Sequence, residues 1–415
     1  MNSRERILAS IEHREPDQVP VDLGSNPSSG ISAIAYNNLT RYLGMDHLQT
    51  RIYDVVQQLA QPDEEILDRF GIDVLDVGRV FNASEDEWHP VTMPDGNTGY
   101  YPVWFKPETD DSGSSIAHHK DGTAIARMPV GATFFDQIHF PWLDGYPDKL
   151  RGLDEAMSKV LWSAFVHSPW DQMHRPDFWK EFRSRVMDLR ENTKRALMVV
   201  AGCNLFEWGT FIRRMDNFML DLYMEPDHVE ALLDALMERH LAFLSDLIEA
   251  VGDLVDIIRF GDDLGSMGGP LMDPDLYREF FKPRHKQLCD FVKAHSSMHI
   301  FLHSCGSIYS LIPDLVEAGF EILNPVQTQS RDMAPERLKR EFGSSVTFWG
   351  GGVETVGILN NASPDRVRSE VLHRLEIFSD GGGFIFNPIH NILPDVPPEN
   401  IIAMFDAVQE FNGST

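Results

Sequence analysis

The sequence Met298-His-Ile-Phe-Leu-His-Ser-Cys-Gly306 decides how the rest of the chain is interpreted. Its apolar residues 298–302 predict a short buried β-strand, and a helix is expected over residues 307–318. His303 and Cys305 follow this strand two positions apart, a spacing that places both side chains on one face of an extended chain. Because imidazole and thiolate are ligands that zinc prefers, the pair indicates part of a metal site. The alternative is a buried cysteine beside a hydrogen-bonded histidine.

Strands and helices alternate on both sides of this stretch. Apolar runs bounded by turn residues predict strands over residues 17–24, 73–78, 196–200, 255–260, 298–302, 321–324, 346–349 and 383–386. Helices are predicted over residues 3–13, 31–43, 51–60, 63–70, 147–165, 176–194, 205–223, 227–250, 274–295, 307–318, 334–341, 364–379 and 398–411. Such alternation implies parallel strands with right-handed crossovers. We therefore expect an α/β protein with a (β/α)8 TIM barrel and an N-terminal extension, and a doubly wound sheet is the alternative.

Residues 85–145 differ from this pattern. They are rich in Gly, Pro, Asp and aromatic residues, and Asp-Gly and Asn-Thr-Gly mark turns between short β runs. We interpret them as a β-rich insertion that serves as a lid or a partner platform. Residues 1–415 are then one barrel domain that carries this insertion.

Composition limits the functions that the chain can have. Its 415 residues include 64 acidic and 36 basic residues, a formal charge of −28, which argues against nucleic acid or an anionic membrane as a partner. No apolar run approaches the roughly 20 residues of a membrane span, and the charged start of the chain does not resemble a secretory signal. Three scattered cysteines suit a reducing cytoplasm better than a disulfide framework.

Polar or glycine-rich segments follow most of the predicted strands. In a barrel, these strand ends meet at one mouth, where active sites lie. A catalytic zinc has three protein ligands and an open position, so His303 and Cys305 need a partner. His390 is the first choice and Glu354 the second, while Cys203 and Asp262 are weaker alternatives. The sequence has no P-loop, no Gly-x-Ser-x-Gly and no lysine at a strand end, which favours a metal site over a serine or lysine nucleophile.

Several segments, in order and spacing, resemble the uroporphyrinogen decarboxylase superfamily and its methyltransferase branch in particular. They are Phe301-Leu-His-Ser-Cys-Gly-Ser-Ile, Ile312-Pro-Asp-Leu, Asn324-Pro-Val-Gln, Phe348-Trp-Gly-Gly-Gly-Val-Glu and Gly381-Gly-Gly-Phe-Ile-Phe-Asn-Pro-Ile-His-Asn-Ile-Leu-Pro-Asp-Val-Pro-Pro-Glu-Asn-Ile. The resemblance covers residues 195–412 well and residues 85–145 poorly. It implies a (β/α)8 barrel, in agreement with the alternation of strands and helices.

Two departures from the superfamily's patterns narrow the expected function. The decarboxylases carry arginines after the first strand to hold substrate carboxylates, whereas this chain reads Asp22-Leu-Gly-Ser-Asn-Pro-Ser28. The methyltransferase branch has a His-x-Cys…Cys zinc motif. His303 and Cys305 match its first half, and His390 stands where the last cysteine falls. A site with fewer thiolates is a better Lewis acid and suits an oxygen-bearing substrate.

The resemblance therefore implies a zinc-dependent O-demethylase. Such an enzyme moves a methyl group from a methoxylated, aromatic small molecule to the Co(I) corrinoid (cobalamin) of a separate corrinoid protein. Asp262 and Asp263 are expected to orient the substrate or to act as general acid. The other residues expected at the mouth are Glu207, as a further catalytic carboxylate, and Asn204, Phe206, Trp208, Asn324, Gln327 and Trp349, as substrate contacts. A homodimer is common in the superfamily.

Three alternatives stay open. The chain could run methyl transfer from a methyl-corrinoid protein to a thiol or folate. It could instead decarboxylate another acid, or bind a corrinoid protein without catalysis.

Overall fold

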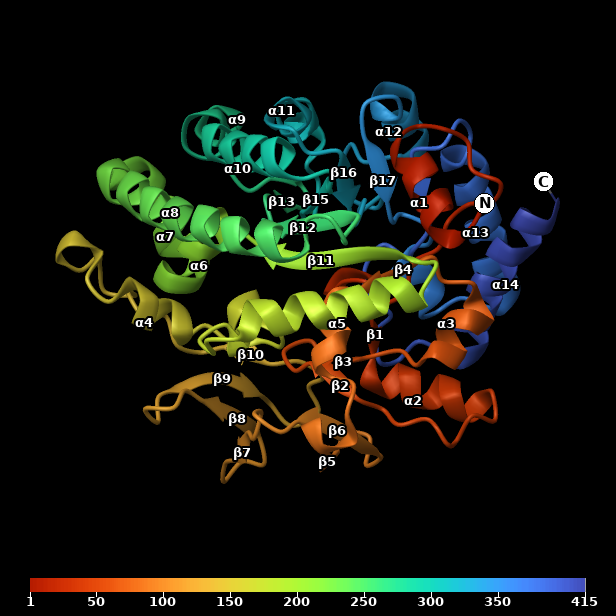
Figure 1. The fold of residues 1–415 in the computed structure, drawn as a ribbon, viewed down its shortest axis with the longest axis horizontal. Helices are drawn as coiled ribbons and strands as arrows, with labels where there is room; N and C mark the ends of the chain where they lie inside the picture. Colours follow the sequence, from red (N-terminus) through yellow and green to blue (C-terminus); the bar gives the residue numbers. More distant parts are fainter. Residues whose placement is uncertain (415) are drawn as a thin grey trace.

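The computed structural model describes residues 1–414, and seven parallel strands form its central sheet (Figure 1). In spatial order they are β18 (Phe384–Ile385), β17 (Thr347–Trp349), β16 (Ile322–Asn324), β15 (His299–His303), β12 (Ile257–Gly261), β11 (Ala196–Gly202) and β4 (Val74–Asp76). Each of the seven lies within or overlaps a strand predicted from the sequence. The order follows the chain, as expected for a barrel and not for a doubly wound sheet.

The segment around Val21 joins the two edges of this sheet and closes the ring. Asp22 N donates to Phe386 O at 2.9 Å and Phe386 N donates to Pro20 O at 2.8 Å, while on the other side Asp73 N donates to Val21 O at 2.9 Å. The predicted strand over residues 17–24 is thus reduced to a single parallel bridge between Val21 and Phe386. One reason is that Val21 N donates to the Asp73 side chain instead of to a strand carbonyl. The (β/α)8 fold is confirmed, with this segment in the place of the first strand.

Helices surround the barrel (Figure 1). They are α1 (Ser3–Ile11), α2 (Ala33–Tyr42), α3 (Glu64–Phe70), α4 (Leu153–Ser158), α5 (Phe178–Asn192), α6 (Phe206–Arg213), α7 (Met215–Met224), α8 (Pro226–Val251), α9 (Pro274–Leu276), α10 (Lys282–His295), α11 (Ile312–Ala318), α12 (Pro335–Phe342), α13 (Pro364–Phe378) and α14 (Pro398–Ser414). The predicted helix over 205–223 is split into α6 and α7 at Arg214, whose φ is 68°. A π-helical turn, Tyr277–Phe281, interrupts the one over 274–295.

Two helix predictions are wrong. Residues 51–60 form β2 (Ile52–Asp54) and β3 (Leu59–Ala60), which pair with each other and, through β3, with β1 (Ile31–Ser32). The Asp54 side chain accepts hydrogen bonds from Val56 N and Gln57 N, and such local bonds compete with a helix. Residues 147–165 contain one short α-helix, α4, with a 3-10 turn on either side of it. Lys149 and Leu150 have φ values near +50°, so the backbone cannot be helical there.

The inserted β-rich segment is present as an antiparallel unit beside the barrel (Figure 1). It contains the hairpin β5 (Trp88–Thr92) and β6 (Thr98–Pro102), followed by β7 (Glu108–Thr109), β8 (Ser115–His118), β9 (Ala124–Met128) and β10 (Asp136–Gln137). The last four pair in the order β10-β9-β8-β7. This unit shares its own hydrophobic cluster, which includes Tyr101, Phe105 and Phe135, with Ile52 of β2 and with Val56 in the turn between β2 and β3. Its role as a lid or platform stays a prediction.

The barrel interior is packed with apolar side chains in its lower part. Met198, Ile257, Phe301, Trp349 and their neighbours form one cluster, into which α1 inserts two apolar side chains from the N-terminal end of the strands. Helix α1 therefore plugs the bottom of the barrel and leaves the other end for chemistry. Within residues 1–414, no helix is both long enough and apolar enough to cross a membrane.

One carboxyl group lies in this interior and predicts a pH-dependent stability. Asp22 is fully buried and accepts hydrogen bonds from Trp349 Nε1 at 2.9 Å and Ser25 Oγ at 2.7 Å. Burial raises its pKa to about 6. The folded protein therefore holds a proton that the unfolded chain releases near pH 4, so this group's contribution to stability falls as the pH rises from about 4 to about 6.

We expect Asp22→Asn to reduce this fall. Between pH 5 and pH 7.5 the group removes about 1.4 kcal/mol from the free energy of unfolding, and the asparagine variant lacks that term. Thermal unfolding of the metal-stripped protein at the two pH values measures the difference. The control is Asp365→Asn, a change of the same kind at an exposed position, which should leave the pH dependence of the wild type. An unchanged pH dependence in Asp22→Asn would contradict a raised pKa at this position.

Candidate metal centre

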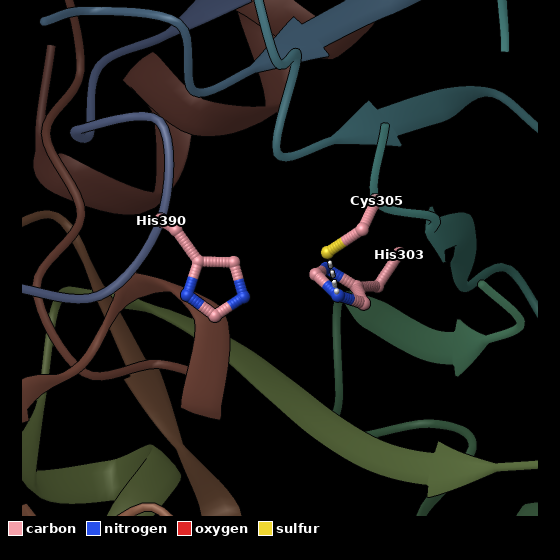
Figure 2. Close-up of side chains that lie close together, drawn as sticks. All are labelled: His303, Cys305 and His390. Carbon is pink, nitrogen blue, oxygen red and sulfur yellow. Dashed lines mark hydrogen bonds between the residues drawn. The ribbon is translucent and has the colours of Figure 1, made fainter. Parts of the chain in front are cut away.

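Three potential metal ligands converge at the mouth of the barrel (Figure 2). His303 ends β15, Cys305 lies two residues further on, and His390 comes from the loop after β18 and faces them from the opposite side. Within residues 1–414 these three form a group whose ligand atoms all lie within 4.8 Å of one another. Cys305 Sγ is 3.4 Å from His303 Nε2. Zinc–ligand bonds of about 2.0–2.3 Å place tetrahedral ligands about 3.5 Å apart, so the pair already has the required spacing.

His303 is oriented by a chain of hydrogen bonds. Its Nδ1 donates to Asn324 Oδ1 at 2.7 Å, and Asn324 Nδ2 donates to Trp349 O at 2.8 Å. Burial, and after it the nearby Arg259 guanidinium, lowers the pKa of His303 to about 3. The imidazole is therefore neutral, with the unprotonated Nε2 directed toward Cys305. Metal-bound histidines show this arrangement, in which one ring nitrogen donates to a fixed acceptor and the other binds the ion.

The loop that carries Cys305 is held by two side chains from neighbouring strand ends. Cys305 N donates to Asp263 Oδ1 at 2.8 Å, and Gly306 N donates to Gln327 Oε1 at 2.8 Å. The backbone at Gly306 has a φ of +80° and lies against Gly265, where an added Cβ atom would come within 2.4 Å of Gly265 C. Only glycine fits this conformation and this approach. The loop geometry therefore fixes where the thiol points.

The three ligands open onto a cavity of about 190 Å³. Its lining includes Tyr53, Asp54, Asp76, Trp162, Trp170, Asn204, Glu207, Phe211, Arg259, Asp263, His303, Cys305 and His390. Burial, together with the carboxylates of Asp263 and Glu207, raises the pKa of the Cys305 thiol. Burial, then Asp263 and Asp262, also raises the pKa of Glu207 well above its usual value. A divalent cation would relieve this crowding of acidic groups, and the donor set fits zinc.

Among the predicted catalytic and substrate residues, Asn204, Glu207 and Asp263 line this cavity. The structure assigns Asp262 a different task. Its carboxylate accepts hydrogen bonds from Phe206 N at 3.0 Å and Glu207 N at 2.9 Å at the start of α6, and it lies 3.2 Å from His285 Nε2. Asp262 is fully buried and caps this helix, as a carboxylate at a helix N-terminus does. Asp262 does not line the cavity, and its contact with substrate stays a prediction.

The predicted aromatic contacts also lie elsewhere. Phe206 packs against Phe218 and Phe281 in the core, and Trp208 is almost fully buried beside Phe211. Trp349 points into the barrel interior, where its ring lies 5.4 Å from that of Phe301. None of the three lines the cavity, which receives Trp162, Trp170 and Phe211 instead. Periodicity identifies these side chains as buried, but it cannot say which side of a strand or helix faces a ligand.

The remaining predicted residues act around the site and not in it. Asn324 and Gln327 hold His303 and Gly306, as described above, and neither lines the cavity. Glu354 caps a π-helical turn by accepting from Val356 N and Gly357 N, and it is not part of the three-ligand group. Cys203 is buried and also lies outside that group. Of the candidates for the third ligand, His390 is the one that belongs to the three-ligand group.

Several polar cavity residues were not among the predicted site residues, and three of them bear on the chemistry. Arg259 lies within β12, Asp76 ends β4 and Tyr53 lies in β2. A signal for Arg259 was present in the sequence, since an arginine interrupts the apolar run Ile257-Ile-Arg-Phe260. Burial raises the pKa of Asp76 to about 7. The Asp76 carboxylate accepts a hydrogen bond from Gly78 N and so caps the start of the turn that follows β4. Tyr53 could not be found because its segment was predicted to be helical.

Comparison with known proteins agrees with this fold and with the motifs around the site. The family model described as uroporphyrinogen decarboxylase (URO-D) matches residues 202–411. The chain therefore belongs to the uroporphyrinogen decarboxylase family, as its motifs predicted. Over its whole length it also resembles the solved structure of a methyltransferase from Methanosarcina mazei, with a TM-score of 0.58, 18% identity and 99% of each chain covered. At that identity, the likeness concerns the fold.

Curated relatives match a shorter part. A uroporphyrinogen decarboxylase of Hydrogenovibrio crunogenus is 29% identical over 194 residues, 46% of this chain and 51% of the relative. The methylcobamide:CoM methyltransferase MtaA of Methanosarcina barkeri is 28% identical over 195 residues, 47% of this chain and 52% of the relative. The chain spans about half the length of the curated relatives it matches. These two relatives have different activities at similar identity, so the choice between them depends on the site.

Proposed function

We propose that this protein is a zinc-dependent, corrinoid-linked methyltransferase that removes a methyl group from a methoxylated small molecule. The observation that carries the proposal is the ligand group itself, two imidazoles and one thiolate at the barrel mouth. A relative of similar identity is a methylcobamide:CoM methyltransferase, which supports methyl transfer within this family. A zinc ion held by His303, Cys305 and His390 would supply Lewis acidity toward an oxygen atom.

The charges around the cavity argue against a porphyrinogen substrate. Asp54, Asp76, Glu207 and Asp263 all line it, and Arg259 is the arginine among its lining residues. A substrate with many carboxylates needs several cations to balance its charge. The segment after the first barrel element, Asp22 to Ser28, supplies none. A methoxylated donor with few charges suits this cavity better.

The reaction requires a poor leaving group to depart. The bond between the methyl carbon and its oxygen breaks, the carbon forms a bond to the Co(I) of the corrinoid protein, and the oxygen keeps the electron pair and takes up one proton. Glu207 and Asp263 line the cavity beside the ligands and are the candidate proton donors. Each tenfold gain in rate needs about 1.4 kcal/mol from such groups.

The test uses the zinc-loaded protein with free cob(I)alamin as the methyl acceptor. Methoxylated aromatic compounds are offered one at a time, and methylcobalamin formation is followed by its absorbance. We expect enzyme-dependent methylcobalamin and one equivalent of the demethylated product. The same mixtures without cobalamin are assayed for CO2.

Two other outcomes would redirect the assignment. Release of CO2 without cobalamin indicates a decarboxylase of another acid. Consumption of methylcobalamin on addition of a thiol, with no reaction of methoxylated donors, indicates the reverse direction of transfer that the name of the MtaA relative describes. Transfer from methylcobalamin to a thiol is therefore the second candidate function. The MtaA relative favours it, whereas a ligand group with one thiolate favours an oxygen-bearing substrate.

A further inference from the structure

The cationic side chain of Arg259 lines the cavity and is not hydrogen-bonded to any of the described residues. Within residues 1–414 it makes no hydrogen bond, and no carboxylate oxygen lies within 4.0 Å of its guanidinium nitrogens; its Nε is shielded from solvent. Burial lowers the pKa of Arg259, while the carboxylates of Glu207 and Asp263 act in the opposite direction without a hydrogen bond to it. Arg259 is half-buried, and a cation that is partly shielded from water without a hydrogen-bonded anion is unfavourable. Within residues 1–414, no acceptor is hydrogen-bonded to this guanidinium.

The position of the guanidinium relates it to the metal ligands. Arg259 lies on β12, two residues before Gly261, and Gly261 pairs with His303 on the adjacent strand. A Cβ atom at Gly261 would come within 3.1 Å of Arg259 Nη1, so the side chain runs along the strand over this glycine. The missing side chain at Gly261 creates the space for the guanidinium. The charge thus lies at the level of the metal ligands.

The nearby carboxylates have other donors. Asp263 Oδ1 accepts from Cys305 N at 2.8 Å, and Glu207 accepts from Asn204 Nδ2. Tyr53 lines the same cavity, and its hydroxyl is also buried without a partner. Burial, then the carboxylate of Asp54, raises the pKa of Tyr53 well above its usual value, so the hydroxyl keeps its proton as a donor. Two unsatisfied donor groups in one cavity call for an acceptor from outside the chain.

We propose that Arg259 and Tyr53 bind a carboxylate of the methyl donor and so select anionic methoxylated compounds over neutral ones. The planar guanidinium offers two parallel N–H donors that match the two oxygens of a carboxylate. A cavity of about 150 Å³ accepts benzene in another protein, so the 190 Å³ here suits a donor with a single ring. The inference rests on the proposed function for the methoxy group, but the anion site itself does not require it.

The test compares a matched pair of probes, 3-methoxybenzoate and its neutral analogue 3-methoxybenzamide. Calorimetric binding to the zinc-loaded protein needs no corrinoid. We expect the wild type to bind the benzoate at least about tenfold more tightly than the amide. Arg259→Gln should weaken benzoate binding by about 30-fold, which corresponds to about 2 kcal/mol, and leave the amide unchanged. Tyr53→Phe should weaken benzoate binding by about fivefold. This variant tests the anion site even if Arg259→Gln does not fold.

The control is Arg183→Gln, which removes an arginine of similar charge that pairs with Asp253 at the surface. It should leave both affinities unchanged. Equal affinity of the wild type for the two probes, or equal losses for both probes in Arg259→Gln, would overturn the inference. Arg259-dependent benzoate binding without methylcobalamin formation would support the anion site and count against methyl transfer. Methyl transfer from both probes at equal rates would support methyl transfer and count against the anion site.

Discussion

Cys305→Ser should lose stoichiometric zinc. It should also reduce the rate of methyl transfer by about 10³-fold, which corresponds to an activation free energy that is higher by about 4 kcal/mol. Changes outside the ligand shell alone cost 10–100-fold in metal affinity, so loss of a thiolate ligand should cost more than about 100-fold. Elemental analysis of the purified variant, after dialysis against a weak chelator, measures the metal content. His390→Ala should behave in the same way, because its ligand atom completes the group.

Glu354→Gln is the matched control. Glu354 was the second choice for the third ligand, and the structure places it at the start of a π-helical turn instead. The variant should retain one zinc per chain and wild-type turnover. If zinc stays in His390→Ala but leaves Glu354→Gln, the ligand group is wrong. If the wild type takes up no zinc from a zinc-containing buffer, the proposed metal chemistry is wrong as a whole.

Gly306→Ala should destabilise the protein by about 4 kcal/mol and also release the metal. One part of the cost is the positive φ, about 1–2 kcal/mol for a residue with a Cβ. The rest comes from contact with Gly265, whose C, O and neighbouring N atoms all lie within 2.6 Å of the added carbon. These are backbone atoms, so the loop that carries Cys305 must shift. At about 2.1 cal/mol/K per residue, 4 kcal/mol lowers the Tm of a 415-residue chain by about 5 °C.

Gly381→Ala separates the two causes. Gly381 also has a positive φ, +71°, but an added Cβ atom would meet nothing within 4 Å. It should lower the Tm by only about 1–2 °C and keep its zinc. Calorimetric scans and metal analysis of the two variants give the comparison. Equal losses in both would show that the close contact between Gly265 and Gly306 contributes little.

The barrel could be predicted because its signal is repeated. Seven apolar runs, most of them followed by polar residues and a helix, leave little freedom for the topology. Two of the errors occur where a side chain replaces a backbone hydrogen-bonding partner, because periodicity does not report such bonds. Asp54 bonds to Val56 N and Gln57 N and turns an apparent helix into two strands. Asp73 bonds to Val21 N and shortens the first strand to a bridge.

The candidate site was predictable in part. His303 and Cys305 share a local spacing, and His390 followed from an aligned motif far along the chain. Asp262 could not be told from Asp263 by sequence, because the two are adjacent and only their orientation separates a helix cap from a cavity residue. Arg259 interrupts an apolar strand, but a single arginine does not by itself indicate which groups lie around it. Its meaning depends on the partners it lacks, which only coordinates reveal.

The closure of the ring has a consequence for how the chain folds during synthesis. Val21 can pair with Phe386 only after the last strand exists, and Val19 bonds through both its N–H and its carbonyl to Asn412, 393 positions away. Contacts this far apart in sequence form late and slow folding. The growing chain therefore holds an open, curved sheet with two unpaired edges until these segments emerge. During that interval, the edges of the incomplete sheet are open to pairing with other chains, which makes delayed closure a route to aggregation.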